Sequence, residues 1–317
     1  MTQFPLTPLP DRPLVSIIIP SFNQGRFIRE TIESCLSQDY RPIEILVVDG
    51  ASTDGTLDVL RQYAGRAEVA WSSEPDSGVV EAVNKGFARA RGAVGAIQSS
   101  DDYYLPGAIR QAVEALKSDR SLGFVFGDII KADAAGRELQ RTALAPFGLE
   151  DWLSVRTWIP QPSTFFRMDL AKVLGGWRPH VPYAADADLW LRMVFRAGAR
   201  KLDALLAVRR MHDAQRDTRR REIIRDYARM IDESEELRGA PQRVRRAAAA
   251  GKHVMRCRYN PTGSDVYGAW NLLMAGCVYP PCLNPRAILL GILYFPVRRR
   301  LARLKHALLR ARRVEES

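Results

Sequence analysis

Two adjacent carboxylates, Asp101 and Asp102, end the stretch AVGAIQSSDD, in which an apolar run of strand length stops at two serines. Side-by-side acids at the end of a buried strand cost charge repulsion and desolvation unless a cation or a hydrogen-bond donor meets them. Mg²⁺ or Mn²⁺ would meet them well, because these hard cations take oxygen ligands and share their shell with substrate phosphates. The alternative is a solvated Asp-Asp turn that caps the helix expected near Pro106.

A second acidic pair, Asp186 and Asp188, lies in the stretch YAADADLWLRMVF. Leu189, Met193 and Val194 recur at helical spacing, so Asp186 is expected at a helix N-terminus and Asp188 in the first turn. The helix dipole favours acids at both positions, and each could be a cap without a catalytic role.

His212 follows the strand expected over residues 202–208 and lies among arginines. A neutral imidazole nitrogen that faces a cation would make it a further metal ligand, and an exposed loop histidine is an equally good interpretation. Arg209, Arg210 and Arg216 could bind phosphate as planar donor forks.

The elements that must position these residues alternate between buried strands and amphipathic helices. Residues 14–20 and 43–48 are nearly continuous apolar runs, typical of strands buried on both faces. Apolar residues recur at helical spacing over 26–37, and Ser52 or Thr53 can cap a second helix. This alternation predicts a parallel sheet with helices on both faces, in which ligands bind at the carboxyl ends of the strands.

Polar groups stand at three of these strand ends, in the loop 21–23, at Asp49 and at the Asp101–Asp102 pair, and they would converge on one crevice. The glycines match neither GxGxxG nor GxxxxGK[ST], so neither a dinucleotide fingerprint nor a P-loop is supported. Nucleotide recognition would therefore rest on carboxylates and backbone groups, with a metal neutralising the phosphates.

Two further segments carry polar candidates. The helix expected after the turn at residues 76–78 bears Asn84 and Lys85 near its middle, where a solvated face explains them as well as a ligand contact does. Gln161 lies between Pro160 and Pro162, which are expected to hold it in extended chain because proline fixes φ and biases the preceding residue away from helix. The alternative is that the two prolines only shape a surface loop.

Four motifs in order, IIIPSFNQG, VVDGASTDGT, DSGVVEAVNKG and IQSSDD, resemble the family 2 glycosyltransferases over residues 14–217. The resemblance implies the α/β GT-A fold, a Rossmann-like and mostly parallel sheet sandwiched by helices. It also implies that Pro20 and Phe22 flank a nucleoside base and that Asp49 accepts a hydrogen bond from it. Further donor-side or acceptor-side contacts are expected from Asn23, Gly78, Asn84, Lys85 and Gln161. Many members carry a second acid where this chain has Gly50.

The same resemblance suggests roles for the acids. Asp101 would contact the ribose or a metal-bound water, Asp102 would ligate a Mg²⁺ or Mn²⁺ ion, and His212 would be a further ligand. The family carries its catalytic base in an E-D-x-D-L motif, and the match puts the base on Asp186. Ala185 replaces the motif's Glu, which leaves Asp188 as an alternative base.

The net charge of +11 is confined to the last third of the chain. Residues 1–218 hold 26 basic and 27 acidic side chains, whereas residues 219–317 hold 21 and 9. We therefore expect a near-neutral catalytic domain over 1–218. A basic, mainly helical extension over 219–317 would meet an anionic surface.

The end of this extension suggests a membrane surface as the partner. The apolar run 287–297 is too short to span a bilayer, which takes about twenty residues. Residues 286–313 contain no acid, and from 301 onward leucines gather on one helix side with arginines on the other. This profile is typical of an interfacial helix drawn to anionic lipid. A partner-docking helix and a polyanion-binding tail are competing interpretations.

The composition, the cysteines and the N-terminal sequence indicate in which cellular compartment the protein works. An apolar content of 46% excludes disorder for most of the chain. The four cysteines show no CxxC spacing, which argues for a reducing compartment and against a zinc site or a disulfide framework. The N-terminus has no basic region followed by an apolar one, so no signal peptide is expected. We predict a cytoplasmic protein at the inner face of the membrane.

The predicted reaction is an inverting, metal-dependent transfer from a UDP-, GDP- or dTDP-type sugar to a hydroxyl of a glycan or lipid-linked acceptor, in polysaccharide or glycolipid synthesis. Nucleic acid is not expected as a partner. A sugar nucleotidyltransferase is one alternative, but it should carry a Gly-rich, cationic loop after the first strand, and SFNQGRF is poor in that respect. A catalytically silent glycan- or polyanion-binding module is the other, and the joint presence of Asp49, Asp101, Asp102 and Asp186 speaks against it.

Overall fold

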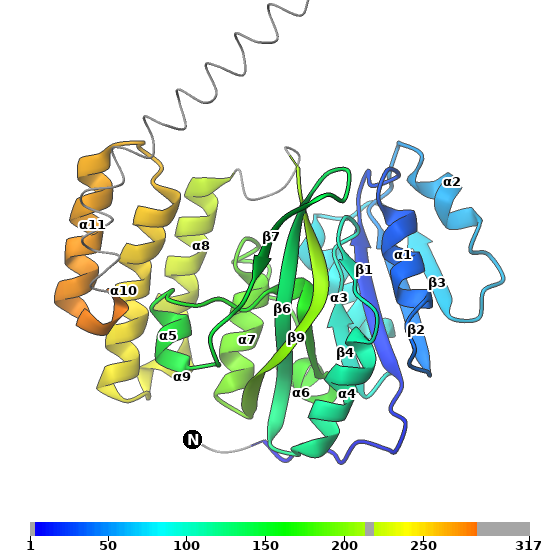
Figure 1. The fold of residues 1–317 in the computed structure, drawn as a ribbon, viewed down its shortest axis with the longest axis horizontal. Coiled ribbons are helices and arrows are strands. Elements are labelled where there is room, and N and C mark those ends of the chain that lie inside the picture. Colours follow the sequence, from blue (N-terminus) through cyan, green and yellow to red (C-terminus); the bar gives the residue numbers. More distant parts are fainter. Residues whose placement is uncertain (1–3, 213–218, 284–317) are drawn as a thin grey trace, which may run out of the picture. The chain divides into compact units, whose positions relative to one another are not determined.

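A computed structural model describes residues 4–212 and 219–283 of the chain (Figure 1). Within it the chain divides into two compact units. Of the described residues, the sheet unit comprises 4–148, 157–212, 219 and 233–236, and the helical unit comprises 149–156, 220–232 and 237–283. The helical unit thus takes a short segment, Leu149–Arg156, from before the domain boundary that we expected at 218/219.

The first half of the sheet unit alternates strands and helices as the sequence predicts. Its elements are β1 (Val15–Ser21), α1 (Ile28–Leu36), β2 (Ile43–Asp49), α2 (Thr56–Arg61), β3 (Val69–Ser73), α3 (Val79–Arg89) and β4 (Val94–Ile97). The strands β3, β2, β1 and β4 lie side by side and parallel, with Ser21 opposite Asp49 at the carboxyl ends of β1 and β2. Every residue of β2 is buried, as a strand covered on both faces requires.

The second half of the sheet unit adds antiparallel strands. Its elements are β5 (Tyr103–Tyr104), α4 (Ala108–Ser118), β6 (Leu122–Asp133), β7 (Glu138–Thr142), the 3₁₀ turn η1 (Gln161–Ser163), β8 (Thr164–Arg167), α6 (Met168–Val173), α7 (Ala185–Val194) and β9 (Gly198–Met211). Strand β8 lies antiparallel between β4 and β6, and β9 runs parallel to β6. The two-residue strand β5 pairs antiparallel with β9, so the segment after the acidic pair lies beside residues 207–208.

Apolar side chains fill both faces of this sheet. On one face, Ile17, Val47 and Phe165 belong to a buried cluster that α1 and α4 help to cover. Elsewhere in the unit, the fully buried Trp190 of α7 packs on Phe124 and Phe166, with ring centroids 5.3 and 5.4 Å apart. Burying aromatic rings of this size stabilises the fold by about 1.5–3 kcal/mol each.

The helical unit is built from α5 (Leu149–Leu153), most of α8 (Arg220–Glu233), α10 (Gln242–Tyr259), α11 (Asp265–Val278) and the 3₁₀ turn η3 (Pro280–Cys282). The short helix α9 (Glu235–Arg238) is shared between the two units. Helix α10 passes close to α5 at Gly251, where an added Cβ would clash with the carbonyl oxygen of Leu153. Tyr227 of α8 donates a hydrogen bond to the same carbonyl, at 2.8 Å. No helix in the described part of the chain is both long and apolar enough to cross a bilayer.

Two local predictions are wrong. Gln161 lies in the 3₁₀ turn η1 and not in extended chain, and the turn is closed by the Ser163 N–H, which donates to the Pro160 carbonyl. Neither Ser52 nor Thr53 caps the second helix, which begins at Thr56 after Gly55. The Ser52 hydroxyl is engaged elsewhere, since it donates to Asp49.

Candidate functional site

The carboxylate of Asp49 is held by donors of its own chain at the end of β2. It accepts hydrogen bonds from the Ser52 backbone at 2.9 Å, the Ser52 hydroxyl at 2.5 Å and the Ser73 hydroxyl at 2.7 Å. Asp49 is fully buried in this setting. An ionised carboxylate has about four acceptor positions, so three of them are occupied and the orientation of Asp49 is fixed.

The loop after β1 is tied to the loop after β2. The Asn23 N–H donates to the Ser52 hydroxyl at 2.7 Å, and the Asn23 side-chain oxygen accepts from the Thr53 N–H at 2.9 Å. Asn23 has a φ of 54°, a left-handed conformation that Asn tolerates better than most residues. Phe22, by contrast, is 59% exposed next to this loop junction, and Pro20 is half-buried. Asn23 therefore shapes the loop, and Phe22 offers a free ring beside it.

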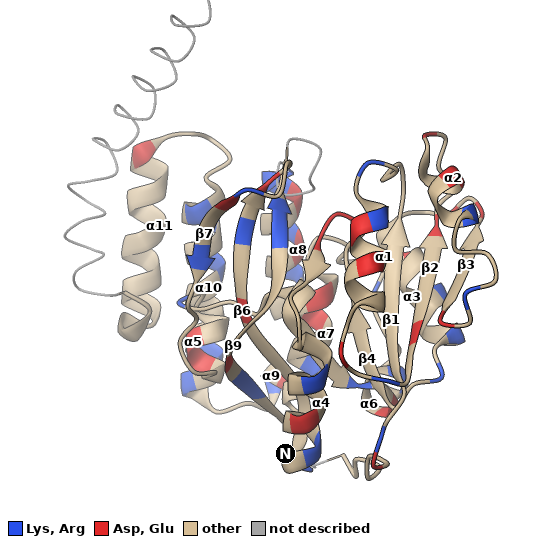
Figure 2. Ribbon diagram, turned by 45° about the vertical axis from the view of Figure 1, so that its right-hand side comes forward, with Lys and Arg blue, Asp and Glu red and all other residues tan. Residues whose placement is uncertain are grey.

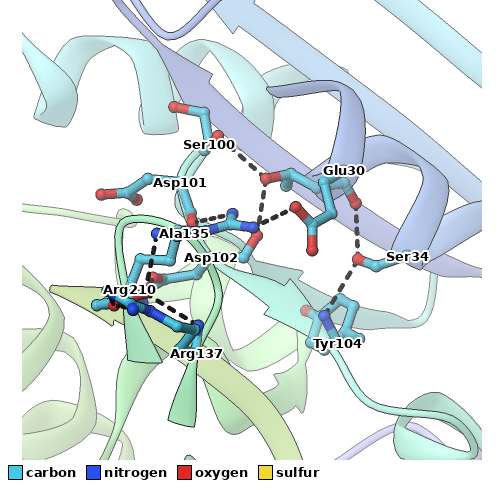
Figure 3. Close-up of polar contacts among 11 residues, drawn as sticks. Glu30, Ser34, Ser100, Asp101, Asp102, Tyr104, Ala135, Arg137 and Arg210 are labelled. Atoms are coloured by element: carbon cyan, nitrogen blue, oxygen red, sulfur yellow. Dashed lines mark hydrogen bonds and ion pairs between the residues drawn. The ribbon is translucent and has the colours of Figure 1, made fainter. Parts of the chain in front are cut away.

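The two adjacent acids have different surroundings (Figure 3). Asp102 is 4% exposed, and its Oδ1 accepts the backbone N–H of Arg210 at 2.8 Å. Burial, together with the neighbouring Asp101 charge, raises the pKa of Asp102 well above its ordinary value. Asp101 instead extends its Oδ2 to His212 Nε2, 2.9 Å away. The side chains of this Asp101–His212 pair are 15% and 11% exposed, so a polar group from outside can reach them.

Arg210 connects β9 to the segment that carries both acids. Its guanidinium donates to the Asp101 carbonyl at 2.8 Å and forms an ion pair with Glu30 of α1. The same guanidinium lies over the rings of Phe27 and Tyr103, with its carbon 5.2 and 4.8 Å from their centroids. Arg210 is 2% exposed, so this charge is held inside the protein by paired groups rather than by water.

His212 has a second contact that fixes its ring. The imidazole stacks on Phe27, with centroids 5.0 Å apart and planes inclined by 29°. Phe27 thus supports both His212 and Arg210. The imidazole is oriented before any ligand arrives, which reduces the cost of ligand binding.

The geometry alters the expected metal ligands. We expected Asp102 with His212, but Asp102 faces the Arg210 backbone, and the acid that meets His212 is Asp101. Within residues 4–212 and 219–283, no cluster of three or more His, Cys, Asp and Glu side chains could hold an ion alone. A carboxylate and an imidazole do fit a cation that arrives with phosphate oxygens, because Mg²⁺ takes one or two protein ligands and completes its shell with substrate and water.

The residues of the third motif have partners within the protein. Asn84 bonds to both backbone groups of Trp177, donating to its carbonyl at 2.8 Å and accepting from its N–H at 2.9 Å. Lys85 forms ion pairs with Glu74 and Glu81, each at 2.9 Å. Asn84 therefore holds the loop at 177 against α3, and Lys85 belongs to a surface ion-pair group. Asn84 is thus committed to the backbone, whereas the ion pairs of Lys85 lie on a solvated helix face.

Gly78 and Gln161 also shape the backbone. Gly78 has a φ of 121°, which side-chain-bearing residues rarely adopt, and its N–H donates to Asp76 at 2.8 Å. The Gln161 amide donates to the Ile97 carbonyl and accepts from the Ser99 hydroxyl at 3.2 Å. Gln161 thereby fastens η1 to the end of β4, directly before the acidic pair.

The second acidic pair separates into a buried and a half-buried residue. Asp188 is 3% exposed and binds Arg192 through two contacts, at 2.9 Å to Nε and 2.7 Å to the terminal nitrogen. Arg192 also donates to the carbonyls of Leu174 and Gly176. This buried ion pair is an internal brace of the sheet unit. Asp186 is half-buried in the first turn of α7, the position that the sequence predicts.

Glu30 and the role of Arg210 were missed by the sequence reasoning. Glu30 lies on the polar side of α1 and is separated from Arg210 by 180 residues. No spacing or motif links two residues so far apart. Arg210 was considered only as a phosphate ligand, whereas its guanidinium faces Glu30 and the Asp101 carbonyl.

Comparisons with known proteins show which family the chain is similar to. The family model described as Glycosyl transferase family 2 matches residues 16–174. An uncharacterized glycosyltransferase of Mycobacterium tuberculosis is 33% identical over 184 residues, which cover 57% of this chain and 68% of the relative. The Bacillus subtilis protein TuaG, named as a glycosyltransferase of teichuronic acid biosynthesis, is 36% identical over 141 residues, 44% of this chain and 55% of that protein.

Among solved structures, the mannosyltransferase PcManGT of Pyrobaculum calidifontis, crystallised with GDP-Man and Mn²⁺, superposes with a TM-score of 0.62. It is 21% identical, and the match covers 94% of this chain and 86% of that one. At this identity the likeness shows the fold.

Proposed function

Because this chain belongs to glycosyl transferase family 2, we propose that it transfers a sugar from a nucleoside diphosphate sugar to a hydroxyl acceptor with inversion at the anomeric carbon. The observation that supports this most is the Asp101–His212 pair, partly exposed among strand ends and oriented by Phe27 and Arg210. This carboxylate–imidazole pair suits a substrate whose phosphate oxygens complete the coordination shell of a cation.

The donor nucleoside is placed, in this proposal, at the joined loops after β1 and β2. The exposed ring of Phe22 and the neighbouring Pro20 would stack on the base, since aromatic rings and planar bases attract each other face to face. Asp49, which is fully buried and held by Ser52 and Ser73, would fix the backbone of the loop that faces the base. Asn23 and Gly78 would contribute by setting the backbone of the two flanking loops.

The diphosphate would lie at Asp101 and His212. We assign these two residues, rather than Asp102, to a Mg²⁺ or Mn²⁺ ion, and the presence of Mn²⁺ in the PcManGT crystal supports the use of a divalent cation. When bound, the ion would neutralise the charge that develops on the departing diphosphate. The chain's own contribution is orientation, because Arg210 and Phe27 fix the carboxylate and the imidazole in advance.

Asp186 is the proposed base. Its carboxylate would accept the proton of the acceptor hydroxyl while that oxygen forms a bond to the anomeric carbon and the bond to the diphosphate oxygen breaks. The products are the glycosylated acceptor, a nucleoside diphosphate and a protonated Asp186. Asp188 takes no part, since it is committed to Arg192.

The acceptor class is proposed from the relatives and from the charge of the chain. TuaG is named for teichuronic acid biosynthesis, which supports a glycan or lipid-linked acceptor of cell-surface polysaccharide synthesis. The excess of basic residues over 219–317 supports recruitment to the anionic cytoplasmic face of a membrane, where lipid-linked acceptors are anchored.

The first test is a panel of UDP-, GDP- and dTDP-sugars, each added to the full chain with Mg²⁺, with Mn²⁺ or with EDTA. We expect one donor to raise the unfolding temperature only when a cation is present, because a ligand that binds the native state stabilises it by mass action. That donor should then release its nucleoside diphosphate when acceptor is added. Asp186→Asn should keep the donor-induced shift and lose turnover by roughly 10²–10⁴-fold. If no donor shifts the melting curve and none is turned over, the proposal fails.

A further inference from the structure

Helix α11 (Asp265–Val278) exposes its large apolar side chains and buries its small ones. Val266, Trp270 and Leu273 are 80%, 60% and 57% exposed. They follow one another at intervals of four and three residues, so they form a single stripe, which we call the α11 stripe. The face that packs inward carries small or polar residues, Gly268, Asn271 and Ala275.

This pattern is the reverse of a helix at a water-exposed surface, which turns charged residues outward and apolar residues inward. The only charged side chain of α11 is Asp265, at its first position. Six large apolar side chains are strongly exposed in the described residues, and three of them make up the α11 stripe. Single exposed apolar residues are ordinary, but a continuous row marks a surface that something apolar covers.

The charge around α11 indicates what covers it. Helix α10, against which α11 packs, presents exposed arginines at positions 243, 245, 246 and 258. The described residues 219–283 carry 12 basic and 7 acidic side chains, whereas α11 itself has almost no charged residues (Figure 2). A second copy of the chain would bring a like charge against this face and be repelled. A bilayer that contains acidic phospholipids offers both an apolar interior and an anionic surface.

We propose that the α11 stripe inserts into the interfacial layer of an anionic lipid membrane, with α11 lying in the membrane plane. Its 14 residues span about 21 Å as a helix, less than the roughly 30 Å of a bilayer's hydrocarbon core, so the helix cannot cross. A tryptophan at the centre of the stripe suits this depth, since indole rings favour the membrane–water boundary. The inference rests on the membrane recruitment proposed above and identifies the apolar part of that contact.

The test measures co-sedimentation of the full chain with vesicles of phosphatidylcholine, with or without phosphatidylglycerol. The variant Val266→Ser/Trp270→Ser/Leu273→Ser keeps every charge and removes the stripe. We expect it to bind the anionic vesicles at least about tenfold more weakly than wild type, because burying even part of three large apolar side chains is worth more than the 1.4 kcal/mol of a tenfold change. The matched control Leu139→Ser/Val173→Ser removes exposed apolar residues of the sheet unit and should bind like wild type.

A second readout does not depend on the stability of the triple variant. Lipids brominated in their acyl chains should quench part of the tryptophan fluorescence of wild type. Trp270→Phe, which conserves the apolar surface, should still bind the vesicles while this quenching falls to the level of unlabelled lipid. If Trp270→Phe leaves the quenching unchanged, the proposal is wrong.

The remaining outcomes separate membrane insertion of the α11 stripe from recruitment by basic residues alone and from self-association. If Arg298→Glu/Arg299→Glu/Arg300→Glu abolishes vesicle binding and the stripe variant binds like wild type, the basic segment alone recruits the chain and the stripe proposal is wrong. If the stripe variant leaves vesicle binding unchanged but turns a dimer into a monomer by light scattering, the stripe is a self-association face. Neither result bears on the transferase proposal, since the assays measure no sugar transfer.

Discussion

Asp101 Oδ2 lies 2.9 Å from His212 Nε2, although 111 residues separate the two in the chain. The pairing of β5 with β9 brings their segments together, and Arg210 holds them there through its backbone N–H to Asp102 and its guanidinium to the Asp101 carbonyl. Of the two adjacent acids, Asp102 therefore secures β9, and Asp101 faces His212 in the site.

Asp101 and His212 should control the cation requirement of the reaction. We expect Asp101→Asn and His212→Ala each to raise the Mn²⁺ or Mg²⁺ concentration that supports half-maximal turnover by about 100-fold, because each removes one of two protein ligands. Cation titration of nucleoside diphosphate release measures this. Phe22→Leu is a useful comparison, since it should weaken donor binding without changing the cation requirement. A His212→Ala protein with a normal cation titration would contradict the assignment.

Arg210 should act as a positioning residue. Arg210→Lys keeps the charge but loses the planar fork that reaches Glu30 and the Asp101 carbonyl together. We expect the apparent cation affinity to fall by roughly 10–100-fold, as for other residues that orient metal ligands. The exposed Arg141→Lys, which disturbs only a surface contact with Glu138, is the matched control. If Arg210→Lys lowers only thermal stability and leaves cation titration and turnover unchanged, its role is purely structural.

Asp186 and Asp188 should respond oppositely to the same substitution. Asp188→Asn leaves the buried Arg192 guanidinium without its anion, and we expect a loss of about 3–5 kcal/mol in the free energy of unfolding. Asp186→Asn should change that free energy little and remove turnover. Chemical denaturation of both variants, beside turnover assays, makes the comparison. An Asp188→Asn protein of wild-type stability would show that the Asp188–Arg192 ion pair does not stabilise the fold.

Stability in acid should depend on Glu44, a buried residue of β2 whose carboxylate contacts Ser16 of β1 and Arg91, which precedes β4. Burial opposes its ionisation, but hydrogen bonds from the Ser16 hydroxyl at 2.5 Å and from the backbone and side chain of Arg91 lower the pKa of Glu44. The unfolded chain therefore binds this proton more readily. The contribution is present above the unfolded pKa, about 4.3, and is lost as the pH falls through the native pKa.

Glu44→Gln should accordingly lose stability at neutral pH and show a smaller further loss between about pH 5 and pH 2 than wild type does. Unfolding temperatures across this range measure the difference. The exposed Glu114→Gln serves as the control and should follow the wild-type profile. Parallel acid profiles for wild type and Glu44→Gln would refute the role of this carboxyl.

Local patterns were sufficient for the alternating first half of the sheet unit. Continuous apolar runs predicted β1 and β2, helical spacing predicted α1, α3 and α7, and Asp186 lies at the start of α7 as expected. The resemblance in four motifs is confirmed by the family match, and the expected GT-A type of α/β fold is confirmed by the likeness to solved glycosyltransferases. Such features can be predicted from a sequence because periodicity, chain breakers and short motifs act over a few neighbouring residues.

The roles of individual polar residues were harder to predict. Asp101 and Asp102 are chemically identical neighbours, and the register of β5 against β9 selects which one faces the Arg210 backbone. Asn84 was ambiguous until its amide met the backbone of Trp177, 93 residues away.

Composition and local order in the chain thus specified which strands and helices form and which acids stand at their ends. The pairing of each acid depended on strand register and on buried hydrogen bonds between distant segments, as with Asp188 and Arg192 in the brace or Asp101 and His212 in the site. A buried carboxylate must be paired wherever the fold brings a donor to it, and that donor is chosen by packing in three dimensions, not by spacing along the chain.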